Sequence, residues 1–130
     1  MWFDHAIFKE KIEFMFNNEL SMEHVEFEQF LYYDTSRLKL FFCSRNIPKV
    51  IPEKWRWKKF NCFMITLACI DVSVLEINGG RVAFECTPII ESTKKKTAVT
   101  IKNNDFYLHC STSTMVIEDI TPHWDVRWTK

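Results

Sequence analysis

The most constraining feature of this sequence is a series of short stretches in which apolar residues recur at every second position. Such stretches, separated by polar residues, prolines or the pair Gly79-Gly80, recur from residue 25 to residue 117. This period is typical of β-strands that bury one face, because successive side chains point to opposite sides of a sheet. The pattern predicts a mainly β fold, either an antiparallel β-sandwich or a strongly bent sheet. The length of 130 residues predicts one domain, residues 1–130.

The first two predicted strands form a hairpin. Residues 25–33 and 37–42 both alternate, and Asp34-Thr35-Ser36 supplies the turn between them. In the first strand, Leu31 is expected on the same apolar face as Phe27, and Phe30 on the opposite face.

The later strands are shorter or more apolar. Residues 61–71 are apolar at both alternating sets of positions, which predicts a strand covered on both sides. Further strands are predicted at residues 75–77, 82–86, 99–101, 106–110 and 115–117. Turns are predicted at residues 78–80, 103–105 and 111–114, and Pro122 is expected to end the last strand.

Two segments depart from the β pattern. Apolar residues recur at helical spacing over residues 4–17, which predicts one short N-terminal helix with Asp4 as its N-cap and Asn17-Asn18 as its end. Residues 45–60 contain Pro48 and Pro52 and are predicted to form a loop. The aromatic residues of this loop are expected to fold back onto the sheet; they are Trp55, Trp57 and Phe60.

Composition disfavours several classes of function. The only glycines are Gly79 and Gly80, so the glycine-rich phosphate-binding loops are missing. Five cysteines lie among apolar residues without any Cys-x-x-Cys, which predicts free, buried thiols in a reducing cytosol. The N-terminal residues are not expected to form a signal peptide, and no apolar run is long enough to span a membrane. The sequence predicts a cytoplasmic protein that binds no cofactor, no metal and no membrane.

Catalytic and nucleic-acid motifs are weak. No Gly-x-Ser-x-Gly elbow exposes a nucleophile, so no catalytic residue is predicted, although a small hydrolase stays open as an alternative. His24, Glu26 and Glu28 share one strand face and could contribute to a metal site, but a solvated strand face has the same pattern. Bases and tryptophans alternate within residues 49–59, as in single-strand binders, yet the net charge of zero disfavours nucleic acid.

Charge is unevenly distributed along the chain. Residues 1–34 carry eight acids and two bases, whereas residues 35–60 carry eight bases and one acid. Glu26 and Glu28 lie on one face of the first predicted strand, and a row of carboxylates can steer a basic partner. The candidate binding residues are Glu19, Glu23, Glu26, Glu28 and Asp34. We refer to these five residues as the acidic strip.

The loop and the strands after it resemble the immunity protein 50 family of bacterial polymorphic toxin systems. The likeness covers roughly residues 20–121, with Ile51 standing where the family often has proline, and Gly80-Arg81 where it often has tryptophan. It is carried by Ile47-Pro48, Ile51-Pro52-Glu53-Lys54-Trp55, Asn61 to Leu67, Ile70-Asp71-Val72, Leu75-Glu76-Ile77-Asn78-Gly79 and Ile117-Glu118-Asp119-Ile120.

The resemblance implies a mostly β protein without catalytic residues that neutralises a toxin encoded by a neighbouring gene. Many such toxins are nucleases with basic clefts, so the expected partner is the C-terminal domain of a cognate toxin, bound directly and stoichiometrically by a chain that is monomeric beforehand. Under this interpretation the acidic strip becomes the expected contact surface. A generic non-catalytic interaction domain remains the alternative.

Overall fold

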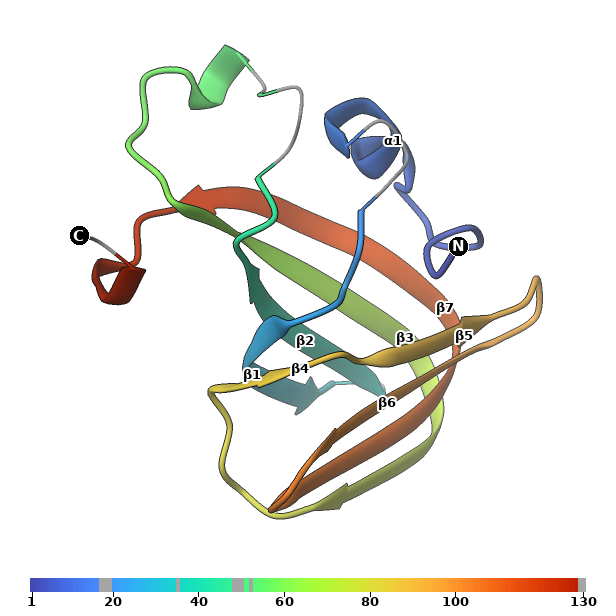
Figure 1. Ribbon diagram of the computed structural model, residues 1–130. Helices are drawn as coiled ribbons and strands as arrows, with labels where there is room; N and C mark the ends of the chain where they lie inside the picture. The colour runs from blue at the N-terminus through green and yellow to red at the C-terminus, as the bar shows by residue number, and fades with distance from the viewer. Residues whose placement is uncertain (17–19, 35, 48–50, 52, 129–130) are drawn as a thin grey trace.

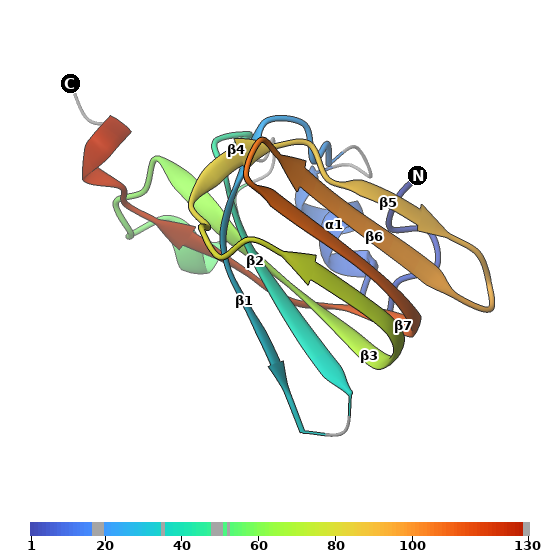
Figure 2. The same ribbon diagram turned by 90° about the horizontal axis from the view of Figure 1, so that it is seen from below.

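The computed structural model describes residues 1–16, 20–34, 36–47, 51 and 53–128, and it is built around one antiparallel sheet. The strand order is β4-β1-β2-β3-β7-β6-β5, and the sheet curls into a half-barrel (Figures 1 and 2). The elements are α1 (Glu10–Phe16), β1 (Val25–Tyr33), β2 (Arg37–Ser44), the 3-10 helix η1 (Glu53–Trp55), β3 (Cys62–Asn78), β4 (Phe84–Cys86), β5 (Ile89–Ser92), β6 (Thr97–Asn103), β7 (Phe106–His123) and the 3-10 helix η2 (Val126–Trp128). The prediction of a mainly β fold with a strongly bent sheet is confirmed.

Strands β3 and β7 form the central pair of the sheet. They are 17 and 18 residues long and pair from Cys62↔His123 to Asn78↔Tyr107. Bulges interrupt the pairing between Thr66 and Leu67 and again near Val72. Bulges increase local twist and bend a strand, so they allow these long strands to follow the curvature of the half-barrel.

The predicted turn at residues 111–114 is wrong, because these residues lie inside β7. Thr112 is buried and its hydroxyl donates a hydrogen bond to the Ile70 carbonyl oxygen of β3. Serines and threonines are common in turns, but here they lie in a strand, and hydroxyl groups of the segment donate hydrogen bonds to the neighbouring strand β3. The expected end at Pro122 is also wrong by one residue, since β7 continues to His123.

The β1–β2 hairpin contains a bulge that changes which residues face the core. The register shifts between Phe27 and Gln29, so one extra residue lies on β1. As a result Phe30 packs against Phe27 and Phe106, with ring centroids 6.3 and 6.0 Å away. Leu31 is 50% exposed. The alternation expected beyond Phe27 is therefore wrong, because a one-residue insertion exchanges the two faces of a strand.

The N-terminal helix is shorter than predicted. It begins at Glu10, and Asp4 instead accepts a hydrogen bond from the N-terminal amine at 2.6 Å. Ile12, Met15 and Phe16 are buried, and the Phe16 ring lies 5.0 Å from that of Phe63. The expected helix end at Asn17-Asn18 lies outside the described residues. Among the residues described, no helix is long and apolar enough to cross a membrane.

The loop after β2 covers part of the core through one tryptophan. Trp55 is buried and packs edge-on against Phe60 at 5.5 Å, as expected. Trp57 is 88% exposed, which contradicts the expectation that it folds back. The predicted loop prolines, Pro48 and Pro52, lie outside the described residues. In Figures 1 and 2, η1 and α1 lie on the same side of the long strands β3 and β7.

The strand predicted over residues 61–71, covered on both sides, is confirmed for residues 62–70 of β3, whereas Asp71 is exposed. Phe63, Ile65 and Leu67 are buried on one face, and Cys62 and Ala68 on the other. The five cysteines are all free and buried, which also agrees with the sequence.

Candidate functional site

The structure brings two residues of the acidic strip together and separates the others. Glu26 and Glu28 both approach the same guanidinium, that of Arg127. Glu23 lies in the turn before β1, and Asp34 lies beyond the opposite end of β1. Glu19 lies outside the described residues. The strip is therefore centred on Glu26 and Glu28, at the start of β1.

Arg127 holds these carboxylates together. Its two terminal nitrogens donate to the two Glu26 oxygens at 3.0 and 2.7 Å, a bidentate pair with good geometry. The same guanidinium donates to Asp125 at 2.6 Å and lies 3.9 Å from Glu28. The side chains of Glu26 and Glu28 are 15% and 27% exposed. We call Glu26, Glu28, Asp125 and Arg127 the acidic cluster.

Asn61 positions the C-terminal half of this cluster. Its side-chain amide donates to the Asp125 carbonyl at 2.8 Å, and its side-chain oxygen accepts from the Asp125 N–H at 2.9 Å. The Asn61 backbone N–H also donates to the His123 carbonyl at 3.1 Å. These bonds fix the segment after β7 so that Asp125 and Arg127 face β1.

The carboxyl groups of the cluster have different proton affinities. Hydrogen bonds from Arg127 lower the pKa of Glu26 and lower that of Asp125 to about 2. Burial, followed by the neighbouring Glu26 carboxylate, raises the pKa of Glu28 to about 7. Three carboxylates therefore share one arginine, and Glu28 carries a proton for part of the time near neutral pH. The cluster has a net negative charge in either state of Glu28.

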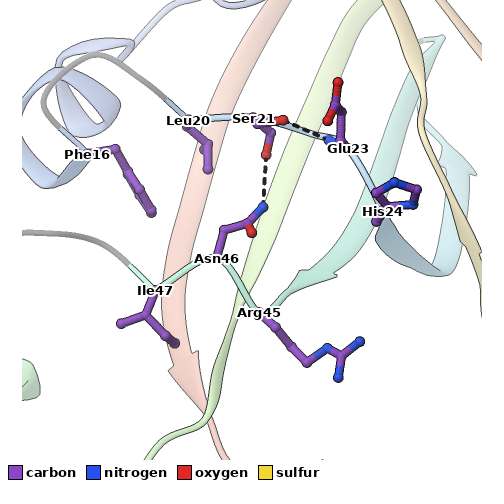
Figure 3. A pocket seen from close by; sticks show the side chains of 8 residues that line it. All are labelled: Phe16, Leu20, Ser21, Glu23, His24, Arg45, Asn46 and Ile47. Carbon is purple, nitrogen blue, oxygen red and sulfur yellow. Dashed lines mark hydrogen bonds between the residues drawn. The ribbon is translucent and has the colours of Figure 1, made fainter.

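Open pockets lie beside the strip. One, of about 470 Å³, is lined by Glu28, Asp125 and Arg127 together with Met64 and His123. Another, of about 590 Å³, is shown in Figure 3. It is lined by Phe16, Leu20, Ser21, Glu23, His24, Arg45, Asn46 and Ile47.

The larger pocket combines an apolar wall with polar groups. Its polar side is held by two hydrogen bonds drawn in Figure 3: Ser21 accepts from the Glu23 N–H at 3.1 Å, and Asn46 donates to the Ser21 carbonyl at 3.5 Å. Glu23 thus belongs to a preformed concave surface rather than to an isolated loop. Such a surface suits the insertion of a partner's side chain.

Several histidine and cysteine side chains, which are common groups in catalysis and metal binding, have structural roles in this fold. His24 lies 3.4 Å from Glu85, and His109 is hydrogen-bonded to Thr100 at 2.9 Å. Burial raises the pKa of Cys86 to about 11 and also raises that of Cys43, so neither thiol is an activated nucleophile. Within the described ranges, no three His, Cys, Asp or Glu side chains are grouped as metal ligands.

The basic residues of the loop after η1 lie on a different surface. Trp57 projects into solvent between Arg56 and Lys58, both of which are exposed. Lys59 lies over the ring of Trp124, with its Nζ 4.2 Å from the ring centroid. The charged loop therefore packs against the segment that carries Asp125, and basic and acidic surfaces adjoin at this end of the molecule.

Sequence reasoning identified Glu26 and Glu28 but missed Asp125 and Arg127. The residues Arg127 and Glu26 are 101 positions apart, and the tail shows no periodicity that would connect them. The one available signal was Asn61, which the family resemblance included and which holds Asp125.

A curled antiparallel sheet with a packed aromatic core places this chain among small, mainly β domains. The family model of Immunity protein 50 matches residues 9–123, which is most of the chain, and the chain belongs to that family. The resemblance seen in the sequence is thereby confirmed, and membership supports an immunity role without catalysis. Comparisons with curated proteins and with solved structures returned no match.

Proposed function

We propose that this protein neutralises a cognate polymorphic toxin by forming a direct one-to-one complex with its C-terminal toxic domain. We further propose that the toxin is a nuclease, that the complex forms in the cytoplasm, and that the chain is monomeric before binding. Membership of the immunity protein family supports a toxin as the partner. The observation that carries the nuclease proposal is the acidic cluster, where three carboxyl groups share one guanidinium and leave a net negative charge.

Charge complementarity connects this cluster to a nuclease. A protein that binds a nucleic-acid backbone places lysines and arginines along its cleft. Carboxylates fixed at the start of β1 imitate that backbone and increase the rate of encounter with such a cleft. Because Asn61 and Arg127 already hold Glu26 and Asp125 in place, little side-chain entropy is lost on binding. The proposed contact surface is the acidic strip, extended by Asp125.

The direct test is a neutralisation assay. The purified protein is titrated into the C-terminal domain encoded by the gene immediately upstream, and cleavage of RNA and DNA is followed. We expect loss of nuclease activity at one equivalent and a one-to-one complex on gel filtration. Full toxin activity without a complex would leave a generic interaction domain as the better description.

The contact surface is tested by charge reversal. We expect the double variant Glu26→Lys/Glu28→Lys to weaken toxin binding by more than about tenfold, because two attractive charges become repulsive. Glu91→Lys is the matched control, since Glu91 is exposed on β5 at the other border of the sheet. Thermal denaturation of both variants separates lost affinity from lost folding. Equal affinities for the two variants would remove the acidic strip from the interface.

A further inference from the structure

One border of the sheet is only half covered. Strand β4 pairs with β1 at Val25, Glu26 and Phe27 and goes no further. Among the residues described, no strand lies against residues 28–33 of β1 on the side away from β2. Figure 2 shows the β1–β2 hairpin extending past the end of β4, with β1 as its outer strand. Residues 28–33 therefore form an open edge, which we call the β1 edge.

Outward-facing backbone groups of this edge have no hydrogen-bond partner among the residues that the structure describes. The Phe27 carbonyl accepts from the Ala83 N–H at 2.7 Å, so the backbone groups of Phe27 point away from β2. Residues of an antiparallel strand alternate between bonding the partner and facing outward. Phe27 is opposite Phe42, and the next outward positions are those opposite Leu40 and Leu38. These positions are Phe30 and Tyr32.

The side chains of the edge also favour pairing. Leu31 and Tyr32 are 50% and 49% exposed, and they are adjacent residues that project from opposite faces of the strand. Native proteins protect open edges with lysine, proline or a very short strand. Residues 28–33 contain no lysine and no proline, and the β1 bulge lies at Glu28, the first residue of this edge. The regular part of the edge is residues 29–33, and it contains none of these protecting features.

Charge determines which strand fits. Glu28 is the one charged residue of residues 28–33 and Asp34 follows in the turn, so a second copy of this edge would bring further carboxylates and no base. A strand with lysine or arginine at its ends would meet Glu28 and Asp34 favourably. The same sign of charge is expected of a nuclease surface.

We infer that the β1 edge binds the toxin by strand addition: an edge strand of the toxin domain, flanked by basic residues, pairs antiparallel with residues 28–33 and extends the sheet. This inference rests on the proposed function and specifies how the complex forms. Main-chain bonds to Phe30 and Tyr32 supply affinity, while Glu28 and Asp34 select a basic strand. The acidic strip and the β1 edge then belong to one continuous interface.

Two variants of one residue separate backbone pairing from side-chain contact. Tyr32→Pro removes the outward N–H, whereas Tyr32→Ala removes the ring and keeps the N–H. Binding to the C-terminal domain encoded upstream is measured for both variants by calorimetry. We expect the affinity of Tyr32→Pro for the toxin domain to be at least about tenfold lower than that of Tyr32→Ala. The proline lacks the N–H that would bond the added strand, and its ring blocks the approach of that strand. Equal affinities of the two variants would overturn strand addition.

A second measurement applies to the unmodified protein and does not depend on the folding of a proline variant. Hydrogen exchange of backbone amides is compared for the free protein and its toxin complex. We expect the Phe30 and Tyr32 amides to exchange much more slowly in the complex. A complex that neutralises the toxin but leaves these amides unprotected would overturn the edge inference alone. The absence of any complex would refute the proposed function as well, so the two failures are distinguishable.

Discussion

Single polar residues decide how the C-terminal segment is attached to the sheet. Asn61 bonds both backbone groups of Asp125, and Arg127 then reaches Glu26 through a bidentate pair. Exposed ion pairs contribute little alone, but this one is partly buried and belongs to a network. This arrangement destabilises the ionised form of Glu28, because its carboxyl group lies beside a second carboxylate and is only partly solvated.

The raised pKa of Glu28 gives a defined dependence of stability on pH. The folded protein holds the Glu28 proton up to about pH 7, whereas the ordinary pKa is 4.5. Between these values the folded state binds more protons than the unfolded state, so stability decreases as pH rises. In the wild-type protein we expect the free energy of unfolding to fall by on the order of 1 kcal/mol between about pH 5 and pH 8. This fall should be missing in Glu28→Gln, which has no proton to lose at this position.

Urea denaturation at both pH values gives the change in the free energy of unfolding with pH for the wild-type protein and for Glu28→Gln. The difference between these two changes measures the contribution of Glu28. The carboxyl groups of Glu26 and Asp125, whose pKa values are lowered, contribute stability that is lost only at more acidic pH. An identical pH profile for the two proteins would contradict the assigned protonation of Glu28.

At the scale of elements, the strands show where local patterns succeed and where pairing overrides them. The β1–β2 hairpin was predicted from apolar residues at every second position, and the doubly covered start of β3 from a continuous apolar run. Strand β5 was missed, and the two strands predicted over residues 106–117 are one strand, β7. The length of a strand depends on hydrogen bonds to segments that are distant in the sequence. A short stretch of sequence does not show these bonds, so it does not predict where a long strand ends.

Thr112 tests whether the middle of β7 is a structural part of the sheet. Its side chain is buried and its hydroxyl bonds the Ile70 carbonyl. We expect Thr112→Val to lower the free energy of unfolding by about 1 kcal/mol, because the shape is kept while the Ile70 carbonyl loses one of its hydroxyl donors and keeps that of Ser113. Thr121→Val, at an exposed position of the same strand, is expected to change stability by less than about 0.5 kcal/mol. Similar small effects for both substitutions, measured by chemical denaturation, would contradict this role for Thr112.

At the scale of the whole molecule, one short segment connects the two borders of the sheet. Strand β4 pairs with β1, and β5 pairs with β6, yet Thr87 and Pro88 alone separate β4 from β5 in the sequence. The sheet must curl for both pairings to form. Phe84 reinforces this closure because its ring lies 5.7 Å from that of Phe27 and 5.4 Å from that of Phe106.

Removing the Phe84 ring is expected to loosen the closure. We predict that Phe84→Ala lowers the free energy of unfolding by about 2–4 kcal/mol, because a large ring is lost from a packed aromatic cluster. Hydrogen exchange should accelerate at the β1 and β6 amides that pair with β4 and β5. Phe14→Ala, which removes an exposed ring from α1, is the control and should leave both measurements nearly unchanged. Equal exchange in the two variants would show that the segment does not hold the borders together.

The sequence by itself determined the fold class, the hairpin, the burial of the cysteines and the proximity of Glu26 to Glu28. Each of these follows from side-chain periodicity or composition within a short window. Tertiary structure alone decided the bulge that turned Phe30 inward, the attachment of Arg127 to Glu26 and the open edge beyond Phe27. These features depend on pairing between residues far apart in the chain, where the free energy of a contact is set by geometry that no local pattern specifies.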